Sequence, residues 1–398
     1  MLQNFIRSLF AVAVFCFWML KLPFLMAARE QVQLFLWNTG YLMERLAVPG
    51  GLAQYLGEFI VQYFVKSVYG ALWYTILLVA VQWLTWRLIR SEKRKVILYL
   101  LSFVPAMMLW YLACNPKIPT TPIIAVLLTL ALMNLLPKRG DIGVGRWVIG
   151  VGCLVMVVGY WLLGPAVAIM AVYLLFCRGI SLFLRPVPLI LLAFCIVGSA
   201  WLVPYPLKQI VRGIDYYWEK ETMGSLEEME YDMLMRQQRW DEMIEKYHQK
   251  GSESLSVNNA ALIVMWQQKR IDQQEVMRRI NLDQRALKNI PSAFLMSEVC
   301  MPLGMTNMSQ RAAFEAMEAI PNYNKSARAL QQLVQTNLIS GNYKVALKYI
   351  SLLKQTFFYR SCARKMKTMA ARPELLKENP FLYRLKEIYD NDEDMLFY

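Results

Sequence analysis

Long apolar runs in the first half of the chain limit what it can fold into. A helix that crosses the apolar core of a bilayer needs about 20 mainly apolar residues. Runs of roughly this length occur seven times, at residues 5–27, 68–89, 96–113, 120–136, 144–163, 165–184 and 187–205. We therefore predict an all-α chain whose first half is a polytopic helical membrane domain with about seven spans.

The first run resembles a signal peptide because Arg7, near its start, precedes its most apolar part. Lys21 and Pro23 interrupt the run, however, and no convincing Ala-x-Ala cleavage site follows. We therefore expect this run to be retained as an anchor.

Charge and composition change near Pro204-Tyr205-Pro206, which we take as a domain boundary. Residues 1–206 contain 16 Lys and Arg against 5 Asp and Glu, whereas residues 207–398 contain 27 against 24. The basic excess therefore belongs to the apolar half, where it is typical of cytoplasmic loops and does not indicate nucleic-acid binding. We expect a membrane domain at 1–206 and a soluble domain at 207–398.

The positions of the cations predict an orientation, because short cytoplasmic loops are enriched in Lys and Arg. The segment before the first span and the loops after the second, fourth and sixth spans are rich in cations. These cations are Arg7, Arg87, Arg90, Lys93, Arg94, Lys95, Lys138, Arg139, Arg146, Arg178 and Arg185. We therefore expect the N-terminus in the cytoplasm of a bacterium and, with an odd number of spans in the inner membrane, a periplasmic C-terminal domain.

The first outer loop, at residues 28–67, is long and amphipathic. Its apolar residues from Leu52 to Phe64 follow helical spacing, and Pro49-Gly50-Gly51 separates this helix from an earlier one. The favoured interpretation is a helix packed on neighbouring spans or lying in the membrane interface. The alternative is a substrate-facing element, in which Glu30, Glu44 or Glu58 would be a working carboxylate.

The second half is predicted to consist almost entirely of helices, because helix-forming residues dominate it. Ser225 followed by Glu228 is a capping box that marks a helix start, and Asp272 followed by Glu275 is a second candidate. The helices are predicted to form short pairs, and Trp240 and Tyr343 are 103 residues apart, close to three periods of about 34 residues.

Two segments of this half resemble the junction between the two helices of a tetratricopeptide repeat. They are Arg239-Trp240-Asp241-Glu242-Met243-Ile244 and Gly341-Asn342-Tyr343-Lys344-Val345-Ala346-Leu347. The resemblance implies that Trp240 and Tyr343 pack across the helix pairs, that Gly341 forms the turn, and that Ala346 lies where two helices approach closely. It departs at Met243, which replaces the small residue of the family. The whole resemblance implies a helical solenoid that binds proteins or peptides.

Cysteine and histidine limit the chemistry of the chain. It has seven Cys with no Cys-x-x-Cys pair, and His248 is its only histidine. We therefore predict no metal site and no cofactor. In a periplasmic domain Cys300 and Cys362 would be free to form a disulfide, but helical repeats rarely need one, and free thiols are the favoured interpretation.

A basic stretch of the second half contains Arg360, Arg364, Lys365, Lys367 and Arg372. The favoured interpretation is a solvated helix face, and contact with anionic lipid headgroups is the alternative.

The layout of the whole chain loosely resembles an uncharacterised bacterial family of multi-span membrane proteins, through the Pro49-Gly50-Gly51-Leu52 turn and the helix after it. The resemblance implies no activity. We predict a membrane-anchored interaction or scaffold protein that binds other envelope proteins through its helical domain. The alternative is a membrane enzyme, such as a lipid-linked sugar transferase that uses a carboxylate of the first outer loop. A transporter is disfavoured because the later spans lack buried acids.

Overall fold

The computed structural model describes residues 2–90, 95–136, 145–176, 182–218, 223–283 and 287–391. Over these ranges the chain is all helical with no β-strand, which confirms the predicted all-α class. Residue contacts divide the chain into two compact units. Unit 1 comprises Met1–Pro23 and Asn38–Glu219, and unit 2 comprises Phe24–Trp37 and Lys220–Tyr398.

This division differs in two ways from a simple boundary at 206/207. Residues just after Pro206 pack with unit 1, because Ile210 and Ile214 form a core cluster with Val203. Further upstream, the segment Phe24–Trp37 belongs to the first half of the sequence but packs with the second half. Composition alone does not reveal this, because the segment is too short to shift the average of either half.

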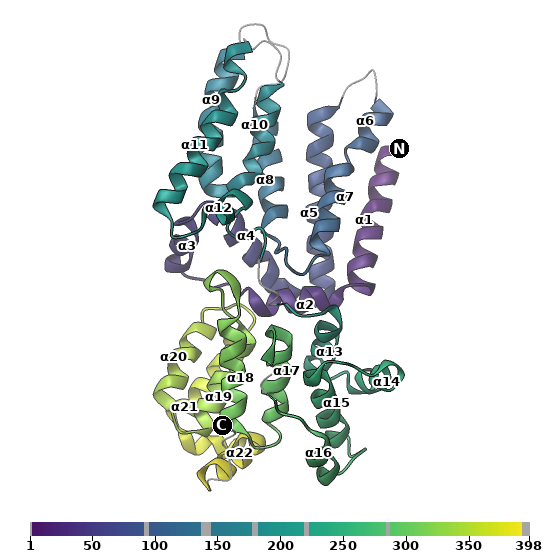
Figure 1. The fold of residues 1–398 in the computed structure, drawn as a ribbon, viewed down its shortest axis with the longest axis vertical. Helices are drawn as coiled ribbons and strands as arrows, with labels where there is room; N and C mark the ends of the chain where they lie inside the picture. The colour runs from purple at the N-terminus through teal and green to yellow at the C-terminus, as the bar shows by residue number, and fades with distance from the viewer. Residues whose placement is uncertain are drawn as a thin grey trace. The chain divides into compact units, whose positions relative to one another are not determined.

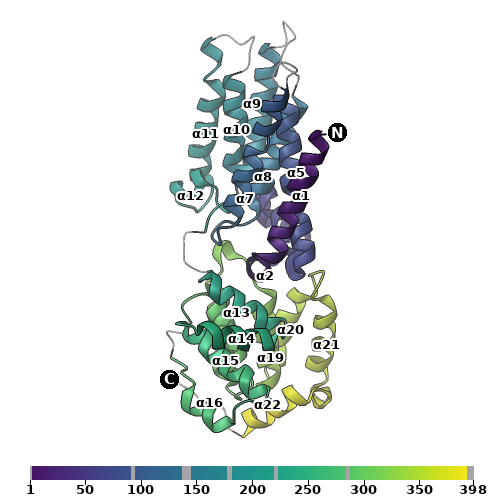
Figure 2. The same ribbon diagram turned by 90° about the vertical axis from the view of Figure 1, so that its right-hand side faces the viewer.

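Unit 1 is built from apolar helices that lie side by side with roughly parallel axes (Figures 1 and 2). These helices are α1 (Leu2–Leu20), α5 (Ser67–Ile89), α6 (Lys95–Leu101), α7 (Val104–Ala113), α8 (Thr121–Leu135), α9 (Gly145–Leu163), α10 (Ala168–Leu175) and α11 (Val187–Leu202), followed by the short α12 (Leu207–Arg212).

Each of the seven predicted apolar ranges overlaps at least one of these helices. Among the described residues, four helical segments are long and apolar enough to cross a membrane: Leu2–Leu20, Ser67–Ile89, Val96–Ala113 and Gly150–Leu175. The helices α8 and α11 are apolar but shorter.

The helices α1 and α5 pack along their length in opposite directions. Near the end of α1, the ring of Trp18 stacks on Tyr74 of α5 with the ring centroids 4.2 Å apart. Near the start of α1, Arg7 Nε donates to Gln82 Oε1 of α5 at 2.9 Å. The beginning of α1 therefore lies beside the end of α5.

The predicted outer loop folds into α3 (Thr39–Leu46), α4 (Gly51–Val61) and a 3-10 turn (Gln62–Val65). Gly50 separates the two helices with a φ of 87°, and its N–H donates to Trp161 O at 2.9 Å. Gly51 has no room for a side chain, because a Cβ there would lie 1.8 Å from Arg45 O. The Pro-Gly-Gly break is therefore required by close backbone packing, and α4 packs against α8 and α9.

Unit 2 starts at Phe24, within α2 (Pro23–Val32), and continues with the C-terminal helices (Figure 1). These are α13 (Leu226–Arg236), α14 (Trp240–Lys250), α15 (Leu255–Gln267), α16 (Gln273–Arg279), α17 (Ile290–Cys300), α18 (Thr306–Glu318), α19 (Ala327–Ile339), α20 (Tyr343–Leu353), α21 (Arg360–Ala371) and α22 (Pro380–Asp390).

Local sequence signals set several of these helix starts. The capping box is confirmed, because Glu228 N donates to Ser225 Oγ at 3.1 Å and Ser225 N donates to Glu228 Oε2 at 3.0 Å. Asp272 likewise accepts from Glu275 N at 2.7 Å. These bonds satisfy backbone donors that have no partner within the helix.

Short connections join the helices of unit 2, and from α17 to α21 each helix packs against the next one along the chain. Gly341 forms the turn between α19 and α20 with a φ of 75°. Ala346 of α20 is fully buried, while Trp240 and Tyr343 are half-buried at the starts of their helices.

Candidate functional sites

The three glutamates predicted as candidate carboxylates lie in two different units. Glu30 is on α2 of unit 2, whereas Glu44 on α3 and Glu58 on α4 belong to unit 1. Their environments also differ, because Glu30 and Glu58 are buried and the Glu44 side chain is about half exposed. The structure therefore gives separate polar clusters and not one shared site.

Glu58 is the centre of a buried cluster in unit 1. Its Oε2 accepts from the hydroxyl of Tyr41 and from Arg45 Nε at 3.0 Å, and its Oε1 accepts from Gln54 Nε2 at 2.9 Å. Arg45 Nη2 also donates to the Tyr41 hydroxyl at 3.1 Å. Both carboxylate oxygens of this fully buried side chain are thus engaged by donors, as buried charges require.

A second acid lies close to this cluster. Asp215 accepts from Thr121 Oγ1 at 2.7 Å and from Trp218 Nε1 at 3.1 Å. Burial raises the pKa of Glu58, the Arg45 guanidinium lowers it, and the Asp215 carboxylate raises it again, with a net upward shift. A buried carboxyl with a raised pKa is found both in catalytic sites and in structural networks.

The remaining groups of the cluster hold their protons. Burial and the Glu58 carboxylate raise the pKa of Tyr41, so its hydroxyl remains a donor. Burial lowers the pKa of the Arg45 guanidinium, but the Glu58 carboxylate and the Tyr41 hydroxyl together outweigh it, with a net upward shift.

Glu44 makes an ion pair with Arg45 at 3.4 Å between Oε1 and Nη1. Because the Glu44 side chain is exposed to water, this pair adds little to stability. Glu44 therefore adds only a weak, water-exposed ion pair to the cluster around Glu58.

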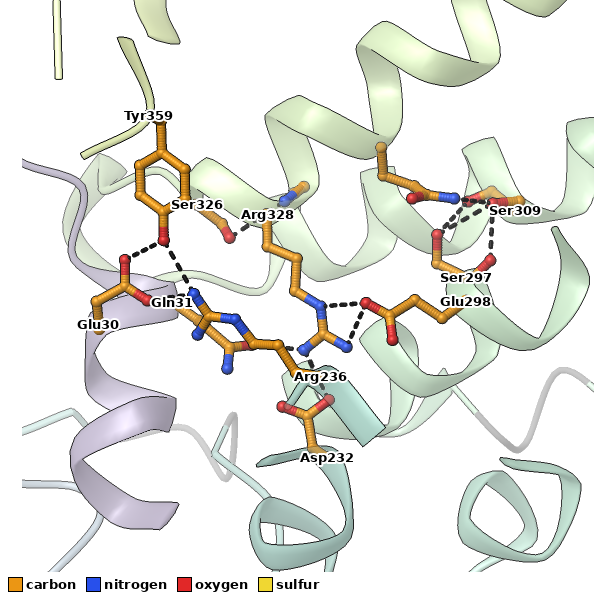
Figure 3. Close-up of polar contacts among 12 residues, drawn as sticks. Glu30, Gln31, Asp232, Arg236, Ser297, Glu298, Ser309, Ser326, Arg328 and Tyr359 are labelled. Carbon is orange, nitrogen blue, oxygen red and sulfur yellow. Dashed lines mark hydrogen bonds and ion pairs between the residues drawn. The ribbon is translucent and has the colours of Figure 1, made fainter. Parts of the chain in front are cut away.

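A larger polar network, which we call the arginine network, lies in unit 2 (Figure 3). On one side of it, Glu30 of α2 accepts from Arg236 Nη2 at 2.9 Å and from the hydroxyl of Tyr359. Arg236 Nη2 also donates to the Tyr359 hydroxyl at 2.9 Å. Burial and the Glu30 carboxylate raise the pKa of Tyr359, so the phenol stays protonated and donates.

On the other side of the network, Arg328 of α19 contacts three helices. Its Nη1 donates to Gln31 Oε1 at 2.6 Å and to Asp232 Oδ1 at 2.7 Å, and its Nε donates to Glu298 Oε1 at 2.8 Å. The guanidinium carbon lies 4.6 Å from the centroid of the Phe294 ring. Burial opposes the Arg328 charge, but the carboxylates of Asp232 and Glu298 raise its pKa, so the side chain stays charged.

The arginine network joins α2 to helices that are far away in sequence. It is extended by two backbone bonds, from Leu34 N to Lys325 O at 3.1 Å and from Trp37 N to Gln355 O at 2.9 Å. The segment 24–37 is therefore bound into unit 2 through side chains and main chain alike.

The two cysteines predicted as a possible disulfide pair lie in unit 2. Cys300 is buried on α17 and Cys362 is half-buried on α21, and no disulfide joins these two residues in the structure. Among the described residues, no group of three or more His, Cys, Asp or Glu side chains has an arrangement suited to a metal ion.

Sequence reasoning missed the arginine network because its members are up to 329 positions apart. One signal was present in the sequence. Arg328 and Asp232 each lie within a helix among residues that become buried, such as Ala327 and Ala329. A charged residue at an apolar position predicts a buried partner.

Comparison with known families gave one result, a match over residues 1–398 to the family described as "Family of unknown function (DUF6057)". The expected loose resemblance to an uncharacterised family is consistent with this match. Searches of curated proteins and of solved structures found no match.

Replacing Arg328 tests whether the arginine network stabilises unit 2. The change Arg328→Ala leaves the buried Asp232 carboxylate without its cation, and we expect it to lower the free energy of unfolding of unit 2 by about 3–5 kcal/mol. Pulse proteolysis of the full-length protein in urea measures this change.

The matched control is Arg270→Ala, which breaks an ion pair with Asp241 whose two side chains are largely exposed. We expect a loss of about 0–1 kcal/mol there. Equal losses in the two variants would show that the arginine network does not hold unit 2 together.

Proposed function

The chain belongs to the DUF6057 family of unknown function, and we propose that it is a membrane-anchored interaction protein. In this proposal unit 1 is embedded in a bacterial inner membrane, and unit 2 is an extracytoplasmic helical domain that binds other envelope proteins.

The observation that carries the proposal is the outward-facing apolar surface of the helices in unit 1. On α1, the side chains of Leu2, Phe5, Leu9 and Val12 are each about 60% exposed or more. Similar side chains face outward on later helices, including Met107, Met108, Tyr111, Phe194, Val197 and Trp201. A surface this apolar is unfavourable in water and suits lipid chains.

The proposed orientation follows from the cations at one end of these helices. Arg7 near the start of α1 lies beside the end of α5, where Arg87 and Arg90 occur. Clustered cations of this kind favour the cytoplasmic side. With seven spans, in which α9 and α10 are counted separately and the shorter α8 and α11 are included, unit 2 would lie outside the cytoplasm.

The proposed binding role of unit 2 is supported by its succession of short helices, each packed on the next from α17 to α21. The turn at Gly341 and the burial of Ala346 are what the resemblance to a degenerate tetratricopeptide repeat implies for these two positions. Solenoids of this type expose extended faces that bind proteins or peptides. The exposed aromatic side chain of Phe314 on α18 is a candidate contact, since aromatic residues are enriched at interfaces.

A reporter of cellular location, fused after Tyr398, tests the anchoring and the orientation. We expect alkaline phosphatase in this position to be active and to sediment with membranes, because the enzyme folds only outside the cytoplasm. A fusion that is inactive as a phosphatase but fluorescent as a cytoplasmic reporter would place unit 2 in the cytoplasm and overturn the orientation.

Photocrosslinking in cells tests the binding role. With a photoreactive amino acid in place of Phe314, we expect discrete adducts with one or a few envelope proteins. The matched control position is Lys269, an exposed residue after α15, where we expect no such adducts. Equal crosslinking at both positions, or none at either, would contradict the proposed interface.

A membrane enzyme is the second candidate, and it is favoured by the buried Glu58 with its raised pKa and the Asp215 carboxylate nearby. The change Glu58→Gln keeps the shape of the side chain and removes its charge. If Glu58 is a working carboxylate, the variant loses the cellular phenotype at a normal protein level, while Glu44→Gln keeps it. A folded Glu58→Gln protein with full function would remove this candidate.

A further inference from the structure

The charges of unit 2 are distributed very unevenly along the sequence. Residues 319–373 contain ten Lys and Arg and no Asp or Glu. The rest of the second half, at 207–318 and 374–398, contains 17 Lys and Arg against 24 Asp and Glu. One continuous stretch is therefore strongly basic within a half that is otherwise acidic.

The helices α20 and α21 carry most of these cations on their exposed sides. The inner side of α21 is apolar, with Ala363, Met366 and Ala370 buried. The exposed cations of the two helices and their connection are Lys344, Lys348, Lys354, Arg360, Arg364, Lys365 and Lys367. None of the ion pairs seen among the described residues involves them. We call this surface the basic face.

Two exposed aromatic side chains lie at the edge of the basic face. Phe357, in the connection between α20 and α21, is 59% exposed, and Trp37 is 48% exposed. The backbone bond from Trp37 N to Gln355 O holds the two segments side by side. Protein surfaces that contact the headgroup region of a bilayer combine exposed aromatic residues with cations.

The chain also tethers unit 2 to the helices proposed to lie in the membrane. The helix α1 ends at Leu20, and unit 2 begins at Phe24. Four residue steps span at most about 14 Å of extended chain. This tether is comparable with the Debye length of about 8–10 Å at physiological salt, within which cations feel the surface charge of a membrane.

We propose that the basic face, together with Trp37 and Phe357, binds the anionic phospholipid headgroups of the membrane that holds unit 1. The proposal rests on the membrane location proposed above. Phosphate groups of the lipid accept hydrogen bonds from the Lys and Arg side chains, and the two aromatic rings enter the interface. The favoured occupant is lipid, and not an acidic protein or a second copy, because the tether keeps unit 2 close to a bilayer at all times.

Lysine labelling of the full chain in lipid nanodiscs, one copy in each, tests the proposal. A water-soluble amine reagent and mass spectrometry give the labelling rate of each lysine. In discs of phosphatidylcholine and phosphatidylglycerol, we expect Lys354 to react about fivefold more slowly than in discs of phosphatidylcholine alone, and high salt to reverse the difference. The control residues Lys250 and Lys269, on other exposed parts of unit 2, should react equally in both discs.

A pair of double variants checks that the surface itself is responsible. Phe357→Ser with Arg364→Gln should abolish the protection of Lys354. The matched control, Phe381→Ser with Arg384→Gln, also removes an exposed aromatic ring and an exposed cation, but on α22, and should leave the protection unchanged.

Three results would overturn the proposal: equal labelling of Lys354 in the two kinds of disc, protection by inorganic phosphate in discs without anionic lipid, or protection only when an acidic protein or a second copy is added. These results differ from failure of the proposed membrane location, in which the chain would not enter nanodiscs at all.

Discussion

The burial of charged side chains of α2 inside unit 2 is the constraint on which the C-terminal half of the structure depends. Charges removed from water cost free energy unless they are closely paired. In unit 2 the carboxylate of Glu30 and the amide of Gln31 find donors in Arg236 and Arg328. The network is satisfied only when α2 is in place, so the fold of this half includes a segment from near the N-terminus.

The cluster around Glu58 has the same physical character on a smaller scale. It links α3 to α4, and it requires the tight turn at Gly50 and Gly51 that brings the two helices together. Close backbone packing and buried polar pairing therefore support each other where α3 meets α4.

Much of the secondary structure could be predicted from the sequence, because it depends on local patterns. Apolar runs gave the helices of unit 1, and the capping box at Ser225 gave the start of α13. The long-range pairing could not be predicted. Nothing near Glu30 in the sequence indicates that its partners are Arg236 and Tyr359, since hydrogen bonds between distant residues leave no periodic signal in a single chain.

The position of the segment 24–37 has a consequence for biosynthesis. Glu30 leaves the ribosome 329 residues before Tyr359, which at ordinary rates of translation is a delay on the order of 20–60 s. Arg236, the first partner of Glu30 to be made, follows it by 206 residues, and Asn38–Glu219 of unit 1 is made in between. Completion of unit 2 is therefore a late folding step of high contact order, in which helices made last pack against a segment from near the N-terminus. A fragment that starts at residue 207 lacks the segment 24–37, which is part of unit 2.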